Sequence, residues 1–312
     1  MGERRGQQAY QNQVEEAAHT HPRGSHPRPI LDRPDSRACD LDQRKNRAAS
    51  CRYNLDSLVR SIPTVPKLPS PVWLFDLDNT LHDASHAIFP AISANMNTYI
   101  ARVLGDGVTP ASQEAVDAAR IGYWKRYGAT LLGMIRHHRV DAADFLRQTH
   151  DIGALHELVR YERGLERLLR RLPGRKILLT NAPTAYSTGV VRHIGLQRQF
   201  AHHVSIEDMR VHGQLHPKPS KLMLRRLLRR HGVSARRCIL VEDTLINLKR
   251  AKQLGLRTAW VTQYLRYSDP IGKAPLPKMV KRPGYVDVKV KSVLRLPAHL
   301  RRLAPRHITE NL

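Results

Sequence analysis

Residues 72–81 read Val-Trp-Leu-Phe-Asp-Leu-Asp-Asn-Thr-Leu: four apolar residues, then Asp76 and Asp78, then the hydroxyl of Thr80. An uninterrupted apolar run of this kind predicts a short strand that is buried on both faces. Side chains two residues apart in an extended chain point the same way, so Asp76 and Asp78 should converge where the strand ends. Two carboxylates held close together repel each other unless a cation lies between them. This stretch therefore predicts a cation-assisted site at the end of a strand.

Three later apolar runs, at 176–180, 238–241 and 257–262, have the same character. Leucines at helical spacing lie between the runs, in one group at Leu165, Leu168, Leu169 and Leu172 and in another at Leu224, Leu227 and Leu228. Strands that alternate with helices of this length predict a doubly wound α/β sheet, whose ligands bind beyond the carboxyl ends of the strands.

Residues 83–160 interrupt this alternation. They contain the helical stretches FPAISANMNTYIARVL, ASQEAVDAARIGYWKRYG and AADFLRQTH and no convincing strand, so an all-helical insertion after the first strand is the simplest interpretation. The predicted fold class is α/β, with a Rossmann-like parallel-sheet core at 71–82 and 161–302 and an inserted helical cap at 83–160.

The two ends of the chain lack this regularity. Residues 1–70 are rich in Gln, Arg, Pro, Asp and His without periodicity, which predicts a disordered N-terminal extension. This extension is either a functional tail or the product of a start codon assigned too far upstream. Residues 303–312 are predicted to be a short C-terminal tail.

Polar residues end three of the predicted strands, and a lysine precedes a helix in the segment HPKPS. Because the carboxyl ends of parallel strands share one edge of a sheet, we expect these side chains to surround one crevice. We call them the strand-end set: Asp76, Asp78, Thr180, Asn181, Lys218, Glu242 and Asp243.

Phosphoryl transfer is the chemistry that such a set would serve. A carboxylate nucleophile can attack phosphorus and form an aspartyl-phosphate, while a second acid protonates the leaving oxygen and later activates water. Carboxylates and a backbone carbonyl are the oxygen ligands that Mg²⁺ prefers. A lysine and a threonine hydroxyl can bind the phosphoryl oxygens.

The segments DLDNT, LLTNA, KP and VED occur in the order of the four motifs of the haloacid dehalogenase-like superfamily, which residues 72–302 resemble. The resemblance implies that Asp76 is the nucleophile and Asp78 the general acid/base. It also implies that Asp76, the Asp78 carbonyl and Asp243 hold Mg²⁺. Dehalogenases of this superfamily lack the second acid, and phosphatases keep it.

The same resemblance assigns phosphate binding to the residues after the second strand and to the lysine. Thr180, Asn181 and Lys218 would bind the phosphate, and Lys218 would also act in catalysis. Glu242 could support the metal ligands from behind or merely face the adjacent helix. Asn247 could give the same support, and it stands where many phosphatases have a second acid.

Three further segments resemble the pyrimidine 5′-nucleotidase group: RYGATLLGM at 126–134, VEDTLINLKRAKQLGLRTAWVT at 241–262 and GYVDVKVKSVLRLP at 284–297. The resemblance implies a phosphoric monoester hydrolase of the 5′-nucleotidase type, acting on a pyrimidine nucleoside 5′-monophosphate. Another small ester, such as a sugar phosphate or phosphoglycolate, is the alternative. Tyr127 and Thr130 are the cap residues expected to face the substrate, whereas His82 and Asp83 are expected to be solvated residues at the entry to the cap.

The charge of the chain indicates either a solvated arginine-rich surface or anionic partners. It carries 52 Lys and Arg against 27 Asp and Glu, a formal net charge of +25. Basic helical segments such as LRRLLRR at 224–230 raise the alternative of a nucleic-acid-binding module on a hydrolase fold. Aromatic residues are only 5% of the chain, and a complete acid set would be unexplained in such a module, so a small phosphorylated substrate is favoured.

Cysteine use and hydropathy bear on the compartment. The three cysteines, Cys39, Cys51 and Cys238, show neither a CxxC motif nor metal-ligand spacing with histidine. This sparse, odd number favours a reducing compartment, and no apolar run reaches the length of a membrane span. We therefore expect a cytoplasmic protein without membrane partners. The sequence does not indicate an oligomeric state.

Overall fold

The computed structural model describes residues 70–265 and 281–303. In these ranges the core is a six-stranded sheet with the order β3-β2-β1-β6-β7-β8, and every neighbouring pair is parallel. Its strands are β1 (Val72–Phe75), β2 (Arg175–Leu179), β3 (His202–Val204), β6 (Cys238–Glu242), β7 (Arg257–Val261) and β8 (Val288–Val290). The α/β fold and the four predicted strands are confirmed. Residues 1–69 of the predicted N-terminal extension (1–70) and residues 304–312 of the predicted C-terminal tail (303–312) lie outside the described residues.

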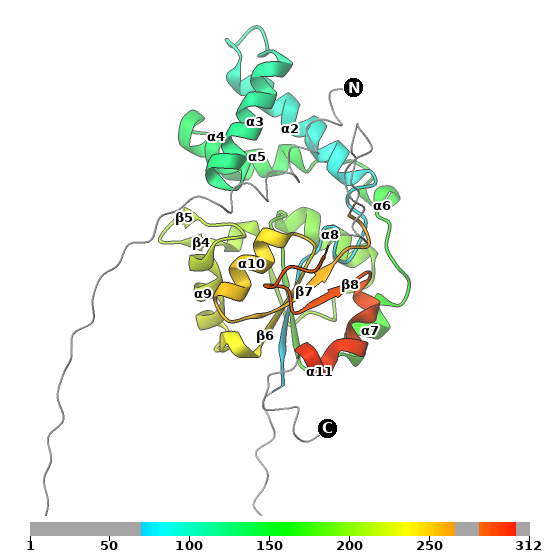
Figure 1. Cartoon of the computed structure of the whole chain (residues 1–312). Helices are drawn as coiled ribbons and strands as arrows, with labels where there is room; N and C mark the ends of the chain where they lie inside the picture. The colour runs from blue at the N-terminus through cyan, green and yellow to red at the C-terminus, as the bar shows by residue number, and fades with distance from the viewer. Residues whose placement is uncertain (1–69, 266–280, 304–312) are drawn as a thin grey trace, which may run out of the picture. The chain divides into compact units, whose positions relative to one another are not determined.

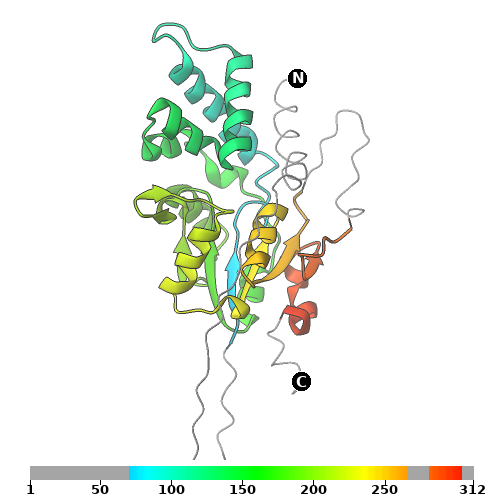
Figure 2. The same ribbon diagram turned by 60° about the vertical axis from the view of Figure 1, so that its left-hand side comes forward.

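Helices cover both faces of the sheet, as Figures 1 and 2 show. On one face pack α7 (Leu165–Arg171), α8 (Thr184–His193) and α11 (Leu300–Leu303), and on the other pack α9 (Lys221–Arg230) and α10 (Leu245–Gln253). Strand β1 serves both layers because its side chains alternate: Trp73 and Phe75 join the first apolar cluster, and Val72 and Leu74 join the second. This double burial explains the uninterrupted apolar run.

Between β1 and α7, the described residues form helices joined by loops and no named strand. The helices are α2 (Ile88–Leu104), α3 (Gln113–Tyr127), α4 (Thr130–His138), α5 (Ala142–Thr149) and α6 (Leu155–Leu158). Helices α2 to α5 share an apolar cluster that includes Tyr99, Met134 and Phe145 and is joined by Ile206 of the core, whereas Leu155 and Leu158 of α6 pack against the first core cluster. The predicted all-helical insertion is confirmed. None of the helices in the described ranges combines the length and the apolar character needed to cross a bilayer.

The order of the strands places a switch point beside β1. From β1 the chain moves outward on one side through β2 and β3, then returns to β6 on the other side of β1 and continues through β7 to β8. In open α/β sheets the crevice at such a reversal is where ligands bind. Asp76 directly follows β1, and Glu242 ends β6, so two members of the strand-end set flank this crevice.

The turn before β2 makes a close approach that only glycine allows. Gly174 has a φ of +87°, and a Cβ there would overlap the carbonyl oxygen of Pro71. The same carbonyl accepts a hydrogen bond from the N–H of Arg175 at 3.2 Å. Gly164 has a similar φ of +95° but no atom within 4 Å of the corresponding position.

We predict that Gly174→Ala destabilises the protein more than Gly164→Ala does. Both substitutions place alanine in the left-handed region, at a cost of about 1–2 kcal/mol. Only the Gly174 variant must also displace the Pro71 carbonyl, which precedes β1 and accepts a hydrogen bond from the start of β2. This displacement adds a cost of about 1–3 kcal/mol. Urea unfolding followed by circular dichroism measures both, and equal losses in the two variants would contradict the prediction.

Candidate active site

Asp76 lies at the carboxyl end of β1 with its side chain buried. Its N–H donates to the carbonyl of Val241 at 3.0 Å, which continues the β1–β6 pairing by one residue. Its Oδ1 lies 2.5 Å from the Nζ of Lys218, and its Oδ2 accepts a hydrogen bond from the Thr80 hydroxyl at 3.3 Å. Both carboxylate oxygens therefore have a partner inside the crevice.

Lys218 joins Asp76 to β6. Its Nζ lies 2.8 Å from Oε2 of Glu242, and its side chain is only 4% exposed. Burial alone would lower the pKa of this ammonium, but Asp76 and Glu242 outweigh burial and raise it. Lys218 is consequently a permanent cation shared between two carboxylates.

Asn181 holds the backbone that carries Lys218. The Asn181 side chain donates through Nδ2 to the Lys218 carbonyl at 3.0 Å and accepts through Oδ1 from the Lys218 N–H at 2.8 Å. The side-chain amide of Asn181, expected to bind phosphate, is thus bonded on both sides to Lys218. Its binding of phosphate stays a prediction, and in this structure the side chain positions Lys218.

Thr180 immediately follows β2 and is buried. Its N–H donates to the carbonyl of Val204 at 3.0 Å, and its Oγ1 accepts from the N–H of Ala182 at 3.1 Å. Because that contact uses the hydroxyl as an acceptor, its proton is left to donate to another group. This is the property that a phosphate-binding threonine needs.

Glu242 and Asp243 come from the end of β6. Glu242 accepts hydrogen bonds from the Asn247 side chain at 3.0 Å and from the N–H of Thr244 at 3.2 Å. Asp243 is held through its carbonyl, which accepts from Trp260 Nε1 at 2.8 Å. Glu242 therefore contacts α10 through Asn247, and its carboxylate also faces the crevice.

Three carboxylates meet at this point. Asp76, Glu242 and Asp243 each offer an oxygen, and the three oxygens lie within 4.8 Å of one another. Burial, then the charge of Glu242, raises the pKa of Asp76, and the same two causes raise the pKa of Asp243. Burial also opposes ionisation of Glu242, but the Lys218 ammonium outweighs it and lowers the pKa of that carboxyl.

The donor set fits a hard divalent cation. It consists of oxygen atoms alone, which suits Mg²⁺. One ammonium faces three carboxylates in the cluster, so a bound cation would offset both burial and the repulsion by Glu242, which raise the pKa of Asp76 and of Asp243. The family resemblance predicted that Asp76, the Asp78 carbonyl and Asp243 are the Mg²⁺ ligands. The cluster adds the carboxylate of Glu242 to the candidates.

Asp78 occupies a different environment from Asp76. Its Oδ1 accepts a hydrogen bond from the Tyr186 hydroxyl at 2.6 Å and lies 3.0 Å from Nε2 of His82. Burial opposes ionisation, but the His82 contact and then the Tyr186 hydrogen bond outweigh it and lower the pKa of Asp78. The side chain of Asp78 remains 16% exposed, which leaves it open to a reacting group.

The surroundings of Asp78 differ from what the sequence predicts. His82 and Asp83 were expected to be solvated, but both are buried. The chain turns after Asp78 so that His82, four residues later, contacts the Asp78 carboxylate, and the N–H of Asp83 donates to the carbonyl of Arg160. Tyr186 comes from α8, and the ring of His150 lies against it at a centroid distance of 5.6 Å. No local pattern in the sequence links Tyr186 or His150 to Asp78, whereas the four-residue spacing of His82 could have suggested it.

Tyr127 and Thr130 flank the turn between α3 and α4. The Tyr127 hydroxyl lies 2.6 Å from Nε2 of His137, and the Thr130 hydroxyl donates to the carbonyl of Arg120 at 3.4 Å. Both contacts stay within the insert. Between the two residues, a Cβ on Gly128 would lie 4.0 Å from Cδ of Pro219, so this turn approaches the segment that carries Lys218. A role for Tyr127 and Thr130 in substrate binding stays a prediction.

Comparisons with known proteins agree with this architecture. The family model described as "Hydrolase: haloacid dehalogenase-like hydrolase" matches residues 72–255. Among solved structures, a HAD phosphatase from Thermococcus onnurineus is 15% identical with a TM-score of 0.50, over 74% of this chain and 97% of that chain. L-2-haloacid dehalogenase from Xanthobacter autotrophicus is 18% identical with a TM-score of 0.45, over 75% of this chain and 100% of that chain.

We predict that Asp243→Asn stabilises the metal-free protein and removes its response to Mg²⁺. The substitution keeps an oxygen for the Thr244 hydroxyl, which donates to Asp243 Oδ1 at 3.1 Å, but removes one of three clustered negative charges. We expect the melting temperature in chelator to rise by about 2–4 °C, equivalent to about 1 kcal/mol.

Exposed Asp151 provides the matched control, because Asp151→Asn changes the net charge equally without touching the cluster. Thermal unfolding with and without Mg²⁺ measures both effects. An Asp243→Asn protein that melts no higher in chelator and is still stabilised by Mg²⁺ would show that the cluster does not hold the cation.

Proposed function

Because the chain belongs to the haloacid dehalogenase-like hydrolases, we propose that it is a Mg²⁺-dependent phosphatase that hydrolyses a small phosphomonoester through an aspartyl-phosphate. One observation carries the proposal. Two carboxylates from the same strand end have opposite surroundings: Asp76 beside Lys218 and the acidic cluster, and Asp78 held by Tyr186 and His82 and partly exposed. Paired acids with separate environments suit a nucleophile and a proton carrier.

In the first step an oxygen of Asp76 attacks phosphorus, and the bond between phosphorus and the leaving oxygen breaks. The leaving oxygen takes its proton from Asp78. The pKa of Asp78 is lowered in the free protein, but a phosphate dianion beside it favours the protonated form by charge repulsion. Tyr186 and His82 both contact Oδ1, so Oδ2 is the oxygen left to carry the proton.

In the second step the Asp78 carboxylate takes a proton from water, and the resulting hydroxide attacks the aspartyl-phosphate. The bond between phosphorus and Asp76 breaks, which returns both aspartates to their starting states and releases inorganic phosphate. Lys218 and Thr180 bind the phosphoryl oxygens throughout. Asp76, Asp243 and Glu242 are the residues that would hold Mg²⁺, which supplies positive charge to the phosphoryl oxygens when bound.

The substrate proposed is a pyrimidine nucleoside 5′-monophosphate. Its support is the resemblance of residues 126–134, 241–262 and 284–297 to the pyrimidine 5′-nucleotidase group. The first of these segments contains the turn between α3 and α4, and Gly128 in that turn approaches Pro219, next to Lys218. A sugar phosphate or phosphoglycolate remains the alternative, since the residues of the crevice act only on the phosphoryl group that all these esters share.

We predict that Asp76→Asn and Asp78→Asn fail in different ways. Asp76→Asn removes the nucleophile, so turnover of every ester should vanish. Asp78→Asn removes only proton transfer, so turnover should fall by about 10²–10⁴-fold. Quenched-flow detection of phosphoenzyme separates them: with an activated ester such as p-nitrophenyl phosphate, the Asp78 variant should still form it. Near-native turnover by Asp76→Asn would show that Asp76 is not the nucleophile.

We further predict that UMP, CMP or dTMP is hydrolysed faster than AMP or glucose 6-phosphate. Discrimination by pocket shape is modest, about 10–200-fold per small group, so a broad secondary range is expected. Tyr127→Ala should raise KM for the preferred nucleotide more than KM for p-nitrophenyl phosphate.

Tyr161→Ala is the control for this experiment, because Tyr161 is 42% exposed and packs only edge-on against His193 among the ring contacts of the described residues. Steady-state kinetics with both esters gives the comparison. If pyrimidine nucleotides are no better than other small esters and Tyr127→Ala affects all equally, the nucleotidase proposal fails while the phosphatase proposal stands.

A further inference from the structure

A second concentration of charge lies outside the strand-end set. Residues 209–241 contain nine Lys and Arg and no Asp or Glu. They form the hairpin of β4 (Arg210–Val211) and β5 (Gln214–Leu215), then α9 and the start of β6. Of these basic residues only Lys218 belongs to the proposed active site. The others need a separate explanation.

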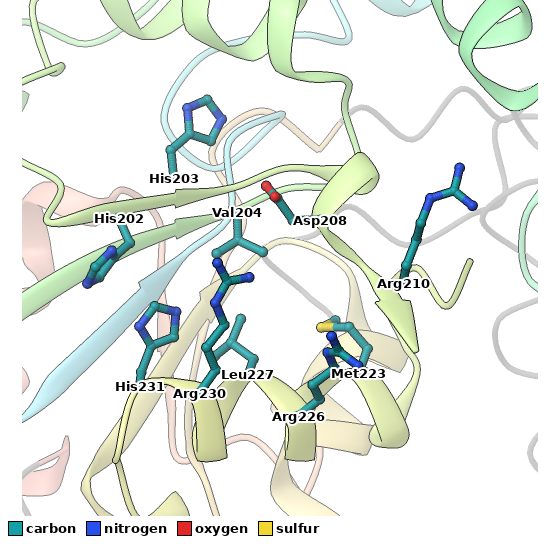
Figure 3. Close-up of a pocket in the computed structure, with 10 residues that line it drawn as sticks. All are labelled: His202, His203, Val204, Asp208, Arg210, Met223, Arg226, Leu227, Arg230 and His231. Carbon is teal, nitrogen blue, oxygen red and sulfur yellow. The ribbon is translucent and has the colours of Figure 1, made fainter. Parts of the chain in front are cut away.

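A cavity of about 80 Å³ lies between edge strand β3 and α9, and we call it the α9 pocket. Figure 3 shows its lining: Val204, Met223 and Leu227 are its apolar side chains, and charged or polar side chains surround them. A water molecule takes about 30 Å³ of liquid, so the pocket has room for a larger group. No member of the strand-end set lines it.

Three arginines line the pocket, and the guanidinium of one of them, Arg210, donates to the carbonyl of Gly213 at 3.2 Å and points away from the others in Figure 3. Arg226 and Arg230 lie one turn apart on the exposed face of α9, and Arg210 comes from the β4–β5 hairpin. None of the three forms an ion pair with an acid anywhere in residues 70–265 and 281–303. Two like charges at this spacing on a helix repel each other, so an anion bound between them would relieve an existing cost.

Two imidazoles complete the basic wall. The rings of His202 and His231 lie 4.4 Å apart between centroids, and Figure 3 shows them extending toward each other from β3 and from the end of α9. Burial, then the charges of His202, Arg175 and Arg230, lowers the pKa of His231. The charged groups that act on His231 besides burial are therefore all basic.

The remaining lining residues do not oppose an anion strongly. Asp208 is the acid of the pocket, and its Oδ2 accepts from the N–H and the hydroxyl of Ser205 at 3.1 and 3.2 Å. These bonds form a capping box for the short helix Ile206–Asp208, and the single carboxylate is outnumbered by the arginines that line the pocket. His203 directs its ring away, to within 2.8 Å of the Ser187 hydroxyl on the α8 side of the sheet.

We propose that the α9 pocket binds a compact tetrahedral oxyanion, either inorganic phosphate or the phosphoryl group of a small metabolite. Guanidinium groups bind phosphate oxygens through paired N–H donors, and the two imidazoles add further donors. The lining contains no Phe, Tyr or Trp on which bases could stack, so its chemistry matches a single phosphoryl group better than a polynucleotide. This site is separate from the proposed phosphatase chemistry.

The test compares two pairs of substitutions on the same helix. Arg226→Ala with Arg230→Ala removes the guanidinium groups of the pocket. Arg225→Ala with Arg229→Ala removes the same charge from exposed positions of α9 that do not line it. Calorimetric titration with inorganic phosphate, at constant ionic strength and with chelator present, measures binding to the full chain and to both variants. Chelator disfavours phosphate at the three carboxylates of the active site, because no cation then neutralises them.

We expect the full chain and the Arg225/Arg229 variant to bind phosphate alike, and the Arg226/Arg230 variant to bind at least about tenfold more weakly. Asp76→Asn should leave this binding unchanged. Titration with a small non-hydrolysable phosphonate should give tighter binding than phosphate if the natural ligand is a metabolite, and weaker binding if it is phosphate itself.

Equal weakening in the two arginine variants, or none in either, would overturn the proposal. Tighter binding in Asp76→Asn, which removes one of the repelling carboxylates, would assign the phosphate to the active site instead. The proposal would also fail if a short oligonucleotide bound more tightly than phosphate, with a steep salt dependence, and if both arginine variants lost oligonucleotide affinity equally. That result would indicate a nucleic-acid-binding surface spread over α9 instead of a phosphate pocket.

Discussion

The ammonium of Lys218, held between the carboxylates of Asp76 and Glu242, is the interaction on which the rest of the crevice depends. All three side chains are almost entirely buried, so each charge has lost most of its hydration. Such charges are stable only when they are paired and hydrogen-bonded, so the position of the Lys218 ammonium must be fixed. Asn181 helps to fix it through two hydrogen bonds to the Lys218 backbone. The segment that carries Lys218 is thereby tied to the ends of β1, β2 and β6 at once.

This pairing still leaves the crevice negative. With Asp243 included, three carboxylates surround one ammonium, and burial together with the charge of Glu242 raises the pKa of Asp76 and of Asp243. Asp78 escapes the conflict because its partners are Tyr186 and His82. The fold thus separates two carboxylates that lie two residues apart after β1: Asp76 joins Lys218 and the acidic cluster, and Asp78 contacts Tyr186 and His82. This separation gives the two acids different chemistry.

Positive charge is distributed quite differently. The α9 pocket gathers arginines without ion-pair partners in the described ranges along the edge strand β3, whereas Lys218 is enclosed among acids at the switch point beside β1. A net charge of +25 raises the local concentration of anions around the whole protein, whichever site they finally reach. Anionic ligands are therefore attracted by a general field, and each site must discriminate among them by its own donors.

The sequence by itself determined the parallel α/β core, the helical insertion and the residues at the strand ends. These features follow from local patterns. A strand buried on both faces must be apolar throughout, as in β1, and the first polar residues after the apolar run mark its end. Strands β3 and β8 were not predicted, because each has only three residues and includes polar side chains such as His202 and Lys289. Their pairing with β2 and β7 extends the sheet without an apolar run of their own.

Only the tertiary structure decided which partners each acid has. Tyr186 lies 108 residues from Asp78 along the chain, and Lys218 lies 142 residues from Asp76, so no local spacing connects either pair. The sequence predicted that Lys218 and Asp76 share a crevice, but not that they form an ion pair. Desolvation likewise depends on all the elements that close over a group, which is why His82, polar and next to a loop, proved to be fully buried. Local sequence specifies which groups are available, and packing from distant segments sets their charge and orientation.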